Sequence, residues 1–534
     1  MLKMRLVINK DSVVKQLSVL LACALLAVGG EINAQLSSRD FLEPVQIDSA
    51  DNVVKRNRIL YFAEANGNVA FNGTNAPYYH VANRQGLSSI SPNNGYLRAG
   101  VIKKMNQAKR FDYGGAIDLA GAAGHSSPFV IQQAYGEVRF LCLDLMVGSK
   151  EYWSEMKNPL LSSGGMVWSG NARPIPQVRL GIFEFVAFPW TNGWLQVKAD
   201  VSYGRFTDDS YLRDEFGGRD IKKWSYTEDV FYHQKKIFFR SKESKDFIMT
   251  IGAELAAQFS GERHYYDSKA EEWTVNKLPL RAKDFWTVFI PGKGDSEAEI
   301  GDQVYYYGNH LGAWHAIAEY KFRDRSRLKG YFEWYFDDAS GMGKMNGWDG
   351  LWGIEYNFGK RGIVSDVVFE YLQTTNQGGP IHWNPGDNQG TAITDVNATG
   401  ADNYYNNYSY VGWAHWGKAN GTPLLRSPEY NRDGYLSFLH NRVKAFHLGV
   451  NGSFASEWDY RLLASYRKSW GTPFIPITEP LYSTSAMVEV VYSPAKLKGW
   501  SFLASCAFDV GTLYDSNSGL SLSVRKTGTV FSYK

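Results

Sequence analysis

Apolar and polar side chains alternate with a period of two through much of this chain, and the stretch 458–470 shows the pattern most clearly. One row of its side chains is mainly apolar and consists of Trp458, Tyr460, Leu462, Ala464 and Tyr466. A period of two predicts a β-strand. Aromatic residues lie near both ends of this row, which is typical of a strand that crosses a bilayer and turns its polar row toward a barrel interior. An amphipathic strand of a soluble sheet has the same period, so the interpretation depends on how often the pattern recurs.

The pattern recurs in about eighteen segments, each of which we expect to form a strand. They are 58–66, 95–104, 107–118, 130–140, 142–149, 177–187, 193–206, 231–240, 246–260, 311–322, 327–337, 349–358, 364–373, 445–454, 458–470, 485–494, 500–510 and 518–526. The polar rows carry charges such as Lys329 and Glu333, which a sealed soluble core would not accept unpaired. We therefore expect the polar rows to face a water-filled lumen.

The connections between these segments alternate in length. Short connections are expected at Asn106, Leu141, 188–192, 241–245, 323–326, 359–363, 455–457 and 495–499. Long connections are expected at 67–94, 119–129, 150–176, 207–230, 261–310, 338–348, 374–444, 470–484 and 511–517. Outer-membrane barrels have this asymmetry, with short periplasmic turns and long extracellular loops.

The fold class that follows is all-β: a transmembrane, antiparallel outer-membrane β-barrel of about 18 strands. An even strand number places both ends of the barrel on the periplasmic side, and closure leaves no unpaired strand edge in hydrocarbon. The alternative, a large soluble β-sandwich or propeller, predicts no alternation of short and long connections.

The N-terminal segment has the features of a signal peptide. Basic residues precede an apolar run at 17–28, and the Ile-Asn-Ala sequence at 32–34 is a small-residue cleavage site. The run is shorter than the roughly 20 residues that a spanning helix needs, so we expect cleavage and export to the outer membrane of a Gram-negative cell. The expected domains are a signal peptide 1–34, a short periplasmic segment 35–57 and the barrel 58–534, whose longest extracellular loop is 374–444.

Composition narrows the range of partners. Aromatic residues make up 15% of the chain, with 33 Tyr and 17 Trp, and these two types suit a membrane interface or a sugar surface. The formal net charge is only +3, and the N-terminal segment carries part of it, so no nucleic-acid partner is expected. Two cysteines, Cys142 and Cys506, follow the cleavage site, and two thiols alone make neither a disulfide framework nor a zinc site.

Sequence motifs give little support for catalysis. There is no H-E-x-x-H, no G-x-S-x-G and no Gly-rich turn between a strand and a helix. His125-Ser126-Ser127 is the nearest approach to a nucleophile beside a base, but adjacency in sequence does not make a triad. We therefore predict no enzymatic activity, no cofactor and no metal.

Several longer motifs are spread over most of the chain beyond the signal segment. They are Asn83-Arg84-Gln85-Gly86-Leu87-Ser88-Ser89, Asn94-Gly95-Tyr96-Leu97-Arg98-Ala99-Gly100, Lys157-Asn158-Pro159-Leu160-Leu161, the run from Trp168 through Asn171-Ala172-Arg173-Pro174-Ile175-Pro176-Gln177-Val178-Arg179, Tyr203-Gly204-Arg205-Phe206-Thr207-Asp208-Asp209, Asp402-Asn403-Tyr404-Tyr405-Asn406-Asn407 and Leu497-Lys498-Gly499-Trp500-Ser501-Phe502. Through these motifs the chain resembles the capsule assembly Wzi family of outer-membrane proteins, in a form typical of Bacteroides-like bacteria.

The resemblance implies an eighteen-stranded barrel that helps to hold capsular polysaccharide at the cell surface as a lectin and not as a catalyst. The partners expected are capsular polysaccharide, outer-membrane lipid and the capsule export machinery, and the protein is expected to be a monomer. Enterobacterial relatives also carry a periplasmic helical bundle that closes the barrel. The corresponding stretch here, 36–57, is too short for a bundle of helices averaging about 11 residues each.

The longest connection, 374–444, holds most of the candidate carbohydrate-binding residues. Aromatic faces stack on the C–H face of a pyranose, and Asn side chains bond its hydroxyls. The candidates are Trp383, Asn403, Tyr404, Tyr405, Asn406, Asn407, Tyr408, Trp413 and Trp416. The same aromatics could instead pack the loop upon itself or into the barrel mouth, and both interpretations stay open.

Arg173 is a further candidate. It lies between small residues and two prolines, so a stiff turn would present its guanidinium to an acidic capsule sugar for bidentate pairing. The competing interpretation is a rigid lead into the following strand, because proline fixes its own backbone and restricts its neighbour's.

Charges on the polar rows form a third set. They include Lys198, Asp200, Glu319, Lys321, Lys329, Glu333, Glu370, Arg461, Arg467 and Glu489. We expect them to pair with one another and stiffen the barrel wall, in preference to forming a selectivity filter.

The function predicted is capsule assembly, by a barrel whose external loops bind and anchor capsular polysaccharide. The alternative is an oligosaccharide-permeable channel, which the short N-terminal segment and the charged lumen leave open. A third hypothesis, a barrel hydrolase, predicts product release that depends on one Ser or His.

Overall fold

The computed structural model describes residues 58–532 apart from several gaps. These gaps are 107–108, 218–224, 268, 297, 299–305, 378–381, 384–397, 400–401 and 432–433. The predicted signal peptide 1–34 and the segment 35–57 lie outside the described residues.

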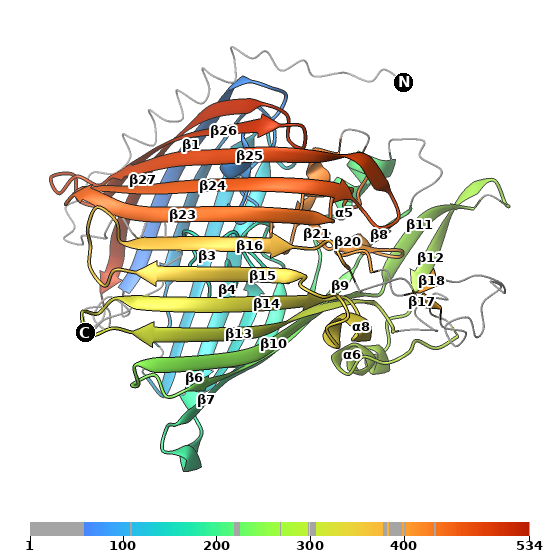
Figure 1. The fold of residues 1–534 in the computed structure, drawn as a ribbon, viewed down its shortest axis with the longest axis horizontal. Coiled ribbons are helices and arrows are strands. Elements are labelled where there is room, and N and C mark those ends of the chain that lie inside the picture. Colours follow the sequence, from blue (N-terminus) through green and yellow to red (C-terminus); the bar gives the residue numbers. More distant parts are fainter. Residues whose placement is uncertain are drawn as a thin grey trace.

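Eighteen antiparallel strands form one closed barrel (Figure 1). They are β1 (Arg58–Asn72), β2 (Asn93–Lys103), β3 (Phe111–Ala123), β4 (Phe129–Phe140), β5 (Leu143–Ser149), β6 (Gln177–Ala187), β7 (Leu195–Arg205), β9 (Phe231–Ser241), β10 (Phe247–Phe259), β13 (Asn309–Lys321), β14 (Arg327–Phe336), β15 (Gly350–Asn357), β16 (Asp366–Gln373), β23 (Val443–Ala455), β24 (Trp458–Gly471), β25 (Pro476–Tyr492), β26 (Trp500–Gly511) and β27 (Asn517–Ser532). Each overlaps one of the predicted segments, so the fold class is confirmed. Consecutive strands of the barrel are hydrogen-bonded neighbours, and β1 closes the ring by pairing with both β2 and β27.

The first and last strands meet at one end of the barrel. Arg58, the first described residue, is paired with Ser532. The connections 141–142, 242–246, 322–326, 358–365 and 456–457 lie at this same end and are all short, as is typical of the periplasmic end of outer-membrane barrels.

The two rows of each strand face opposite sides of the wall, as the period of two predicts. In β24 the row of Trp458, Leu462 and Tyr466 is exposed on the outside, whereas Arg461, Ser465 and Arg467 in the alternate row are buried inside. Exposed apolar side chains on the outside are what a hydrocarbon environment requires.

Three connections that were predicted to be long are short turns. The chain passes from β3 to β4 through 124–128, from β24 to β25 through 472–475, and from β26 to β27 through 512–516. Pro476 and Pro480 lie in the first part of β25 and have no N–H to donate to a ladder. Both prolines precede Ser483, where the pairing of β25 with β26 begins, so β25 extends past the barrel rim without losing a bond there.

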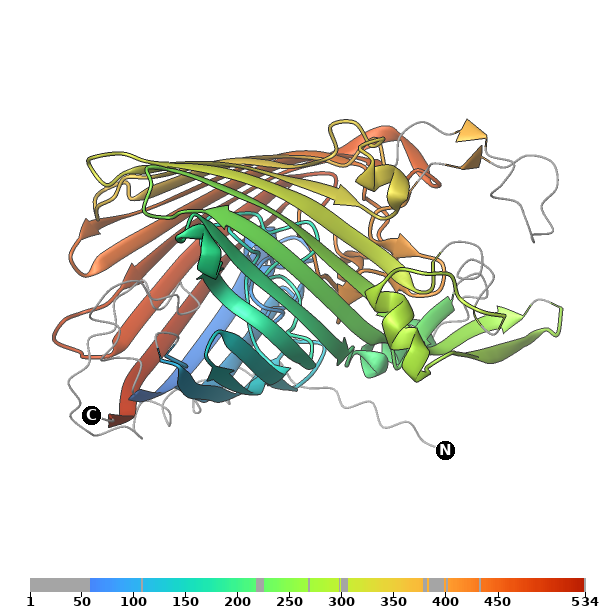
Figure 2. The ribbon, with the colours of Figure 1, turned by 90° about the horizontal axis from the view of Figure 1, so that it is seen from below.

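The lumen holds folded loops, which corrects the expectation that water fills it. Segments 76–90, 150–176, 402–431 and 434–442 pack inside the ring of strands, and Figure 2 shows loops crossing its interior. The largest buried cluster joins Met166, Trp168 and Trp413 of these loops to wall residues such as Tyr335 and Leu372. Apolar burial of this kind is worth roughly 25 cal/mol per Å², so the loops and the wall stabilise each other.

Smaller elements lie in the long loops. They are α4 (Tyr78–Val81), η1 (Pro189–Thr191), α5 (Asp209–Leu212), η2 (Arg213–Gly217), β8 (Ser225–Glu228), β11 (Gly261–Asp267), β12 (Glu272–Leu278), α6 (Ala282–Phe289), α8 (Ala339–Met342), β17 (His382–Trp383), β18 (Ala398–Thr399), β19 (Asn406–Asn407), β20 (Val411–Gly412), β21 (Ala414–His415), β22 (Lys418–Ala419) and η4 (Pro428–Tyr430). Strands β8, β11 and β12 form a separate sheet beyond the barrel. Among the described residues, no helix has the length and apolar character needed to cross a bilayer.

Candidate functional site

Three of the predicted binding residues are wholly buried among the loops and the wall. Tyr404, Tyr405 and Trp413 belong to the largest apolar cluster. Their polar atoms are satisfied internally, since the Trp413 indole N–H donates to Val167 O over 2.7 Å and the Tyr405 hydroxyl donates to Met166 O. In this conformation they offer no face to a sugar and instead hold the long loop against segment 150–176.

Three predicted asparagines shape the same loop. Asn406 accepts a hydrogen bond from Phe438 N over 2.7 Å and donates to Phe438 O over 2.9 Å. Asn403 accepts from Asn406 over 3.0 Å, and Asn407 accepts from Ser409 N over 2.8 Å. These are the local side-chain-to-backbone bonds by which Asn commonly orders loops.

Two of the remaining candidates lie apart from the largest cluster. The Tyr408 ring is 76% exposed, with the Arg263 guanidinium 4.1 Å from its centroid. Trp383 lies in β17, and its side chain lies outside the described residues. Tyr408 is therefore the most accessible aromatic surface among the candidates that the structure describes.

Arg173 and Trp416, predicted on separate loops, are brought together at the loop end of the barrel. The Arg173 guanidinium lies 4.1 Å from the centroid of the Trp416 ring, which is half-buried. This is a cation–π contact of the kind worth about 0.5–2 kcal/mol. The Tyr211 ring of α5 also lies near Trp416, with 6.3 Å between the two ring centroids. We call Arg173, Trp416, Tyr211, His125 and Asp208 the mouth cluster.

Backbone contacts between two of the sequence motifs fix the position of Arg173. Gln85 N and Gly86 N donate to Gly170 O and Asn171 O over 2.6 and 2.9 Å. Gly86 has a φ of +70°, and a Cβ there would lie 2.4 Å from Arg173 N. Only glycine allows this approach, so the Asn83–Ser89 motif acts as a support for the Arg173 turn.

A backbone hydrogen bond and the following glycine fix the position of Trp416. Its N–H donates to the Asp208 carboxylate over 2.9 Å. The next residue, Gly417, has a φ of +75°, and a Cβ there would lie 2.2 Å from the Tyr211 hydroxyl oxygen. The turn therefore places the indole against Arg173 and close to Tyr211.

Arg173 makes no direct ion pair in the described part of the chain, although the Asp208 and Glu429 carboxyls act on it at longer range. Arg173 is only 8% exposed, and its Nε has no hydrogen-bond partner among the described residues. Burial lowers the pKa of Arg173 to about 10, so it stays charged at neutral pH. Burial raises the pKa of the Asp208 carboxyl to about 7, which leaves that carboxyl largely protonated in mildly acidic solution.

His125 adds two further unused polar atoms. Both of its ring nitrogens are buried without a hydrogen-bond partner, and burial, with Lys418 and Arg173 nearby, lowers its pKa to about 4. Next to it, the exposed Ser126 accepts from Arg173 over 3.4 Å. The exposed Ser126 thus lies at the edge of a cluster that contains a guanidinium, a neutral imidazole and an aromatic ring.

Sequence reasoning missed His125, Asp208 and Tyr211 as members of this cluster. Asp208 lies within the Tyr203–Asp209 motif, and His125 was considered only as a base beside Ser126. Nothing local to these residues indicates the contact, because the loops that bring them together lie far apart in sequence.

The polar-row charges are paired, but many of their partners come from the infolded loops. Lys198 binds Glu155 over 2.8 Å, and Glu333 binds Lys157, so two wall residues pair with segment 150–176. Wall-to-wall pairs are also present, such as Arg179–Asp200 at 2.7 Å. The prediction of mutual pairing is confirmed in part, since it left out the loop partners.

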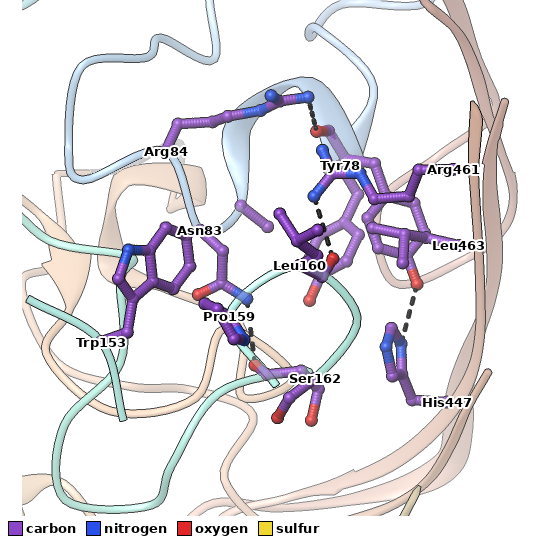
Figure 3. A pocket seen from close by; sticks show the side chains of 13 residues that line it. Tyr78, Asn83, Arg84, Trp153, Pro159, Leu160, Ser162, His447, Arg461 and Leu463 are labelled. Carbon is purple, nitrogen blue, oxygen red and sulfur yellow. Dashed lines mark hydrogen bonds between the residues drawn. The ribbon is translucent and has the colours of Figure 1, made fainter. Parts of the chain in front are cut away.

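A small pocket lies between α4, segment 150–176 and the wall (Figure 3). It is lined by residues that include Tyr79, Arg84, Trp153 and His447, and its volume is about 20 Å³. That is room for about one water molecule and not for a sugar ring.

Glu254, His315 and Glu333 are close enough to share a metal ion. However, Lys157 donates to Glu333, and Gln234 donates to Glu254 over 2.5 Å. The Lys236 ammonium also lies 4.0 Å from Glu254. Two nearby ammonium groups oppose a divalent cation, so these residues fit an internally paired network better than a metal centre.

A closed antiparallel barrel with an apolar outer surface, short turns at one end and long loops at the other belongs to the outer-membrane class of β-barrels. No protein-family model matches the chain, and no curated protein matches it. Among solved structures, it is similar to Wzi of Escherichia coli, described as an outer-membrane carbohydrate-binding barrel involved in group 1 capsule assembly, with TM-score 0.52, 12% identity and coverage of 91% of this chain and 86% of that one. A second, more distant match is OpdQ of Pseudomonas aeruginosa, with TM-score 0.43, 9% identity and coverage of 89% and 98%. At these identities the likeness shows the fold alone.

Proposed function

We propose that this protein is an outer-membrane barrel that binds an acidic capsular polysaccharide at its outer mouth and so helps to anchor the capsule. It acts as a non-catalytic lectin. The observation that carries the proposal is Arg173, a buried guanidinium over the Trp416 ring that makes no direct ion pair in the described part of the chain, with Asp208 and Glu429 acting on it only at longer range. A buried charge without a direct partner is costly, and a uronate or similar anionic sugar group would give Arg173 a direct ion pair.

Chemistry around Arg173 supports a sugar better than a simple ion. Trp416 and Tyr211 offer aromatic faces, the His125 ring offers a donor and an acceptor, and Tyr408 with Arg263 supplies another stacked aromatic–cation pair. Polysaccharide binding uses this mixture of ring stacking, hydroxyl bonding and charge pairing. The fold shared with a carbohydrate-binding capsule barrel is consistent with the same use.

Binding of purified protein in detergent to an acidic capsular polysaccharide tests this proposal. The Arg173→Gln variant should bind about tenfold or more weakly, because a hydrogen-bonded charge contributes roughly 1.5–3 kcal/mol. Arg205→Gln is a suitable control, since Arg205 lies at the same barrel end, is half exposed and pairs with Asp229. Equal binding by the parent and Arg173→Gln would reject the assignment.

The alternative function, an oligosaccharide channel, requires a continuous path through the lumen. The infolded loops and their buried contacts with the wall disfavour such a path. We expect no steady current in planar bilayers. A stable open-channel conductance that oligosaccharides block would favour the channel instead.

A further inference from the structure

Helix α6 lies on the outer surface of the barrel, outside the ring of strands (Figure 2). Its Val288 packs with Ala257 and Phe259 of β10 in a separate buried cluster. Ala257 and Phe259 belong to the outward row of β10, whose earlier members Phe247, Met249 and Ile251 are exposed. The helix therefore covers the end of a row that is otherwise exposed on the lipid-facing side.

The covered patch of wall contains polar groups that hydrocarbon would not accept. Tyr203 donates from its hydroxyl to Phe285 O over 2.8 Å, and the Lys235 ammonium donates to Phe289 O at the helix C-terminus. The His233 ring packs 5.9 Å from the Phe289 ring. A carbonyl at a helix C-terminus is a favourable partner for a cation, so α6 both shields these groups and satisfies them.

The segment that contains α8 also lies on the outside of the barrel, against β14 and β15. The Trp334 indole, on the outward row of β14, donates to Gly341 O of α8 over 2.8 Å. The Lys344 ammonium lies 4.5 Å from the Trp334 ring centroid, and Trp352 packs 5.6 Å from Trp348. We call α6 with residues 280–290, together with residues 339–348, the collar.

The outward side of the collar is mainly apolar: Trp286 contacts Phe289 within the collar, Trp348 contacts Trp352 of β15, and Lys283 is the exposed charged residue of α6. Trp286, Ile290, Met345 and Trp348 are all more than half exposed, at 63, 54, 51 and 69%. Tryptophan in such a position is typical of a membrane–water interface, where its ring lies among lipid headgroups.

The height of the collar fits that interface. Phe247 begins β10 next to a short turn, ten residues before Ala257 beneath α6. At about 3.3 Å per residue and a tilt near 40°, ten residues rise about 25 Å, which is the usual height of the lipid-facing band. The collar therefore lies at the upper boundary of the band and is continuous with it.

From these contacts we infer that the collar is a lipid-binding surface. It rests in the headgroup region of the outer leaflet, with Trp286 and Trp348 inserted at its boundary with the acyl chains. This inference does not depend on polysaccharide binding, since the collar and the mouth cluster share no residue. The amphipathic collar would fix the depth of the barrel in the membrane, as interfacial helices do.

Spin-label accessibility in a bilayer tests the inference. The two exposed cysteines, Cys142 and Cys506, are first replaced by Ser in the full chain, and nitroxide labels are attached after Trp286→Cys or Met345→Cys. Trp273→Cys on β12, in the separate sheet beyond the barrel, is the matched control. The proteins are studied in vesicles of phosphatidylcholine and phosphatidylglycerol, with oxygen and a water-soluble nickel chelate as relaxants.

The labels at 286 and 345 should be accessible to oxygen but several-fold less accessible to the nickel chelate than the label at 273. Equal nickel accessibility at all three positions would show a water-exposed surface and overturn the inference. Low accessibility to both relaxants at 286 and 345 would show a protein partner, such as a second copy, and would also overturn it. Because a label replaces one exposed side chain at a time, the barrel itself is left intact.

Discussion

Individual buried charges hold the loops inside this barrel. Glu489 of β25 has no exposed surface; it accepts a hydrogen bond from Arg84 of the first loop over 3.0 Å and forms an ion pair with Arg461 of β24 at 2.6 Å. One carboxylate thus joins the plug to the wall. In a low-dielectric interior, removing such a partner leaves its cations uncompensated.

The Glu489→Gln variant should be strongly destabilised. It keeps the shape of the side chain but leaves Arg84 and Arg461 without a counter-charge, at a cost of about 3 kcal/mol or more. Urea unfolding in lipid vesicles measures the free energy of unfolding. Glu479→Gln, at an exposed position of the same strand, is the control and should change it little. A Glu489→Gln variant as stable as this control would contradict the role assigned to the pair.

Stability should also depend on the protonation of Asp208. Burial raises its pKa from 3.8 to about 7, so the folded state binds a proton that the unfolded state has lost between about pH 4 and pH 7. The contribution of this group to stability is therefore present below pH 4, declines as pH rises toward 7, and is lost above it.

The Asp208→Asn variant should flatten this pH dependence. The amide oxygen can still accept from Trp416 N, and the side chain no longer ionises. The midpoint of thermal unfolding in detergent, measured at pH 5 and pH 8, should fall with pH in the parent and fall less in the variant. An identical pH difference in both proteins would show that Asp208 ionises as freely in the folded state as in the unfolded one.

At the level of elements, the strands could be predicted and the loops could not. The period of two that predicts a strand can be read from adjacent residues within that strand alone. All eighteen barrel strands therefore overlap predicted segments. Where a loop folds depends on partners far away in sequence, such as Leu161, which packs on Gly449 of β23. The mouth cluster shows the same limit: Arg173 and Trp416 could be singled out as candidates, but their contact could not. Tyr404, Tyr405 and Trp413 are residue types that suit both a core and a sugar, and only the fold shows them buried.

Close packing of a loop on the wall can be tested at Gly449. A Cβ there would lie 2.6 Å from Leu161 O, so Gly449→Val should displace segment 150–176 from the wall. Protease cleavage within this segment should become faster in vesicles with the outer mouth exposed. Gly330→Val is the control, because a Cβ at Gly330 would meet nothing within 4 Å. Equal cleavage of the two variants would mean that the segment is held elsewhere.

The whole molecule is a barrel plugged by its own loops. The charged polar rows predicted a water-filled lumen, the short N-terminal segment left a closed pore in doubt, and folding of the long loop into the barrel mouth was one of two open interpretations. Here segments 76–90, 150–176, 402–431 and 434–442 fill the lumen and place Arg173 and Trp416 at the outer mouth.

The most direct test compares one acidic capsular polysaccharide with the same polymer after chemical reduction of its carboxyl groups to alcohols. Binding of both to the purified parent protein would be measured by biolayer interferometry at physiological salt. We predict that reduction weakens binding about tenfold or more, since the Arg173 guanidinium then loses its charged partner. Equal affinity for the acidic and the reduced polymer, or no binding to either, would contradict polysaccharide anchoring through the mouth cluster.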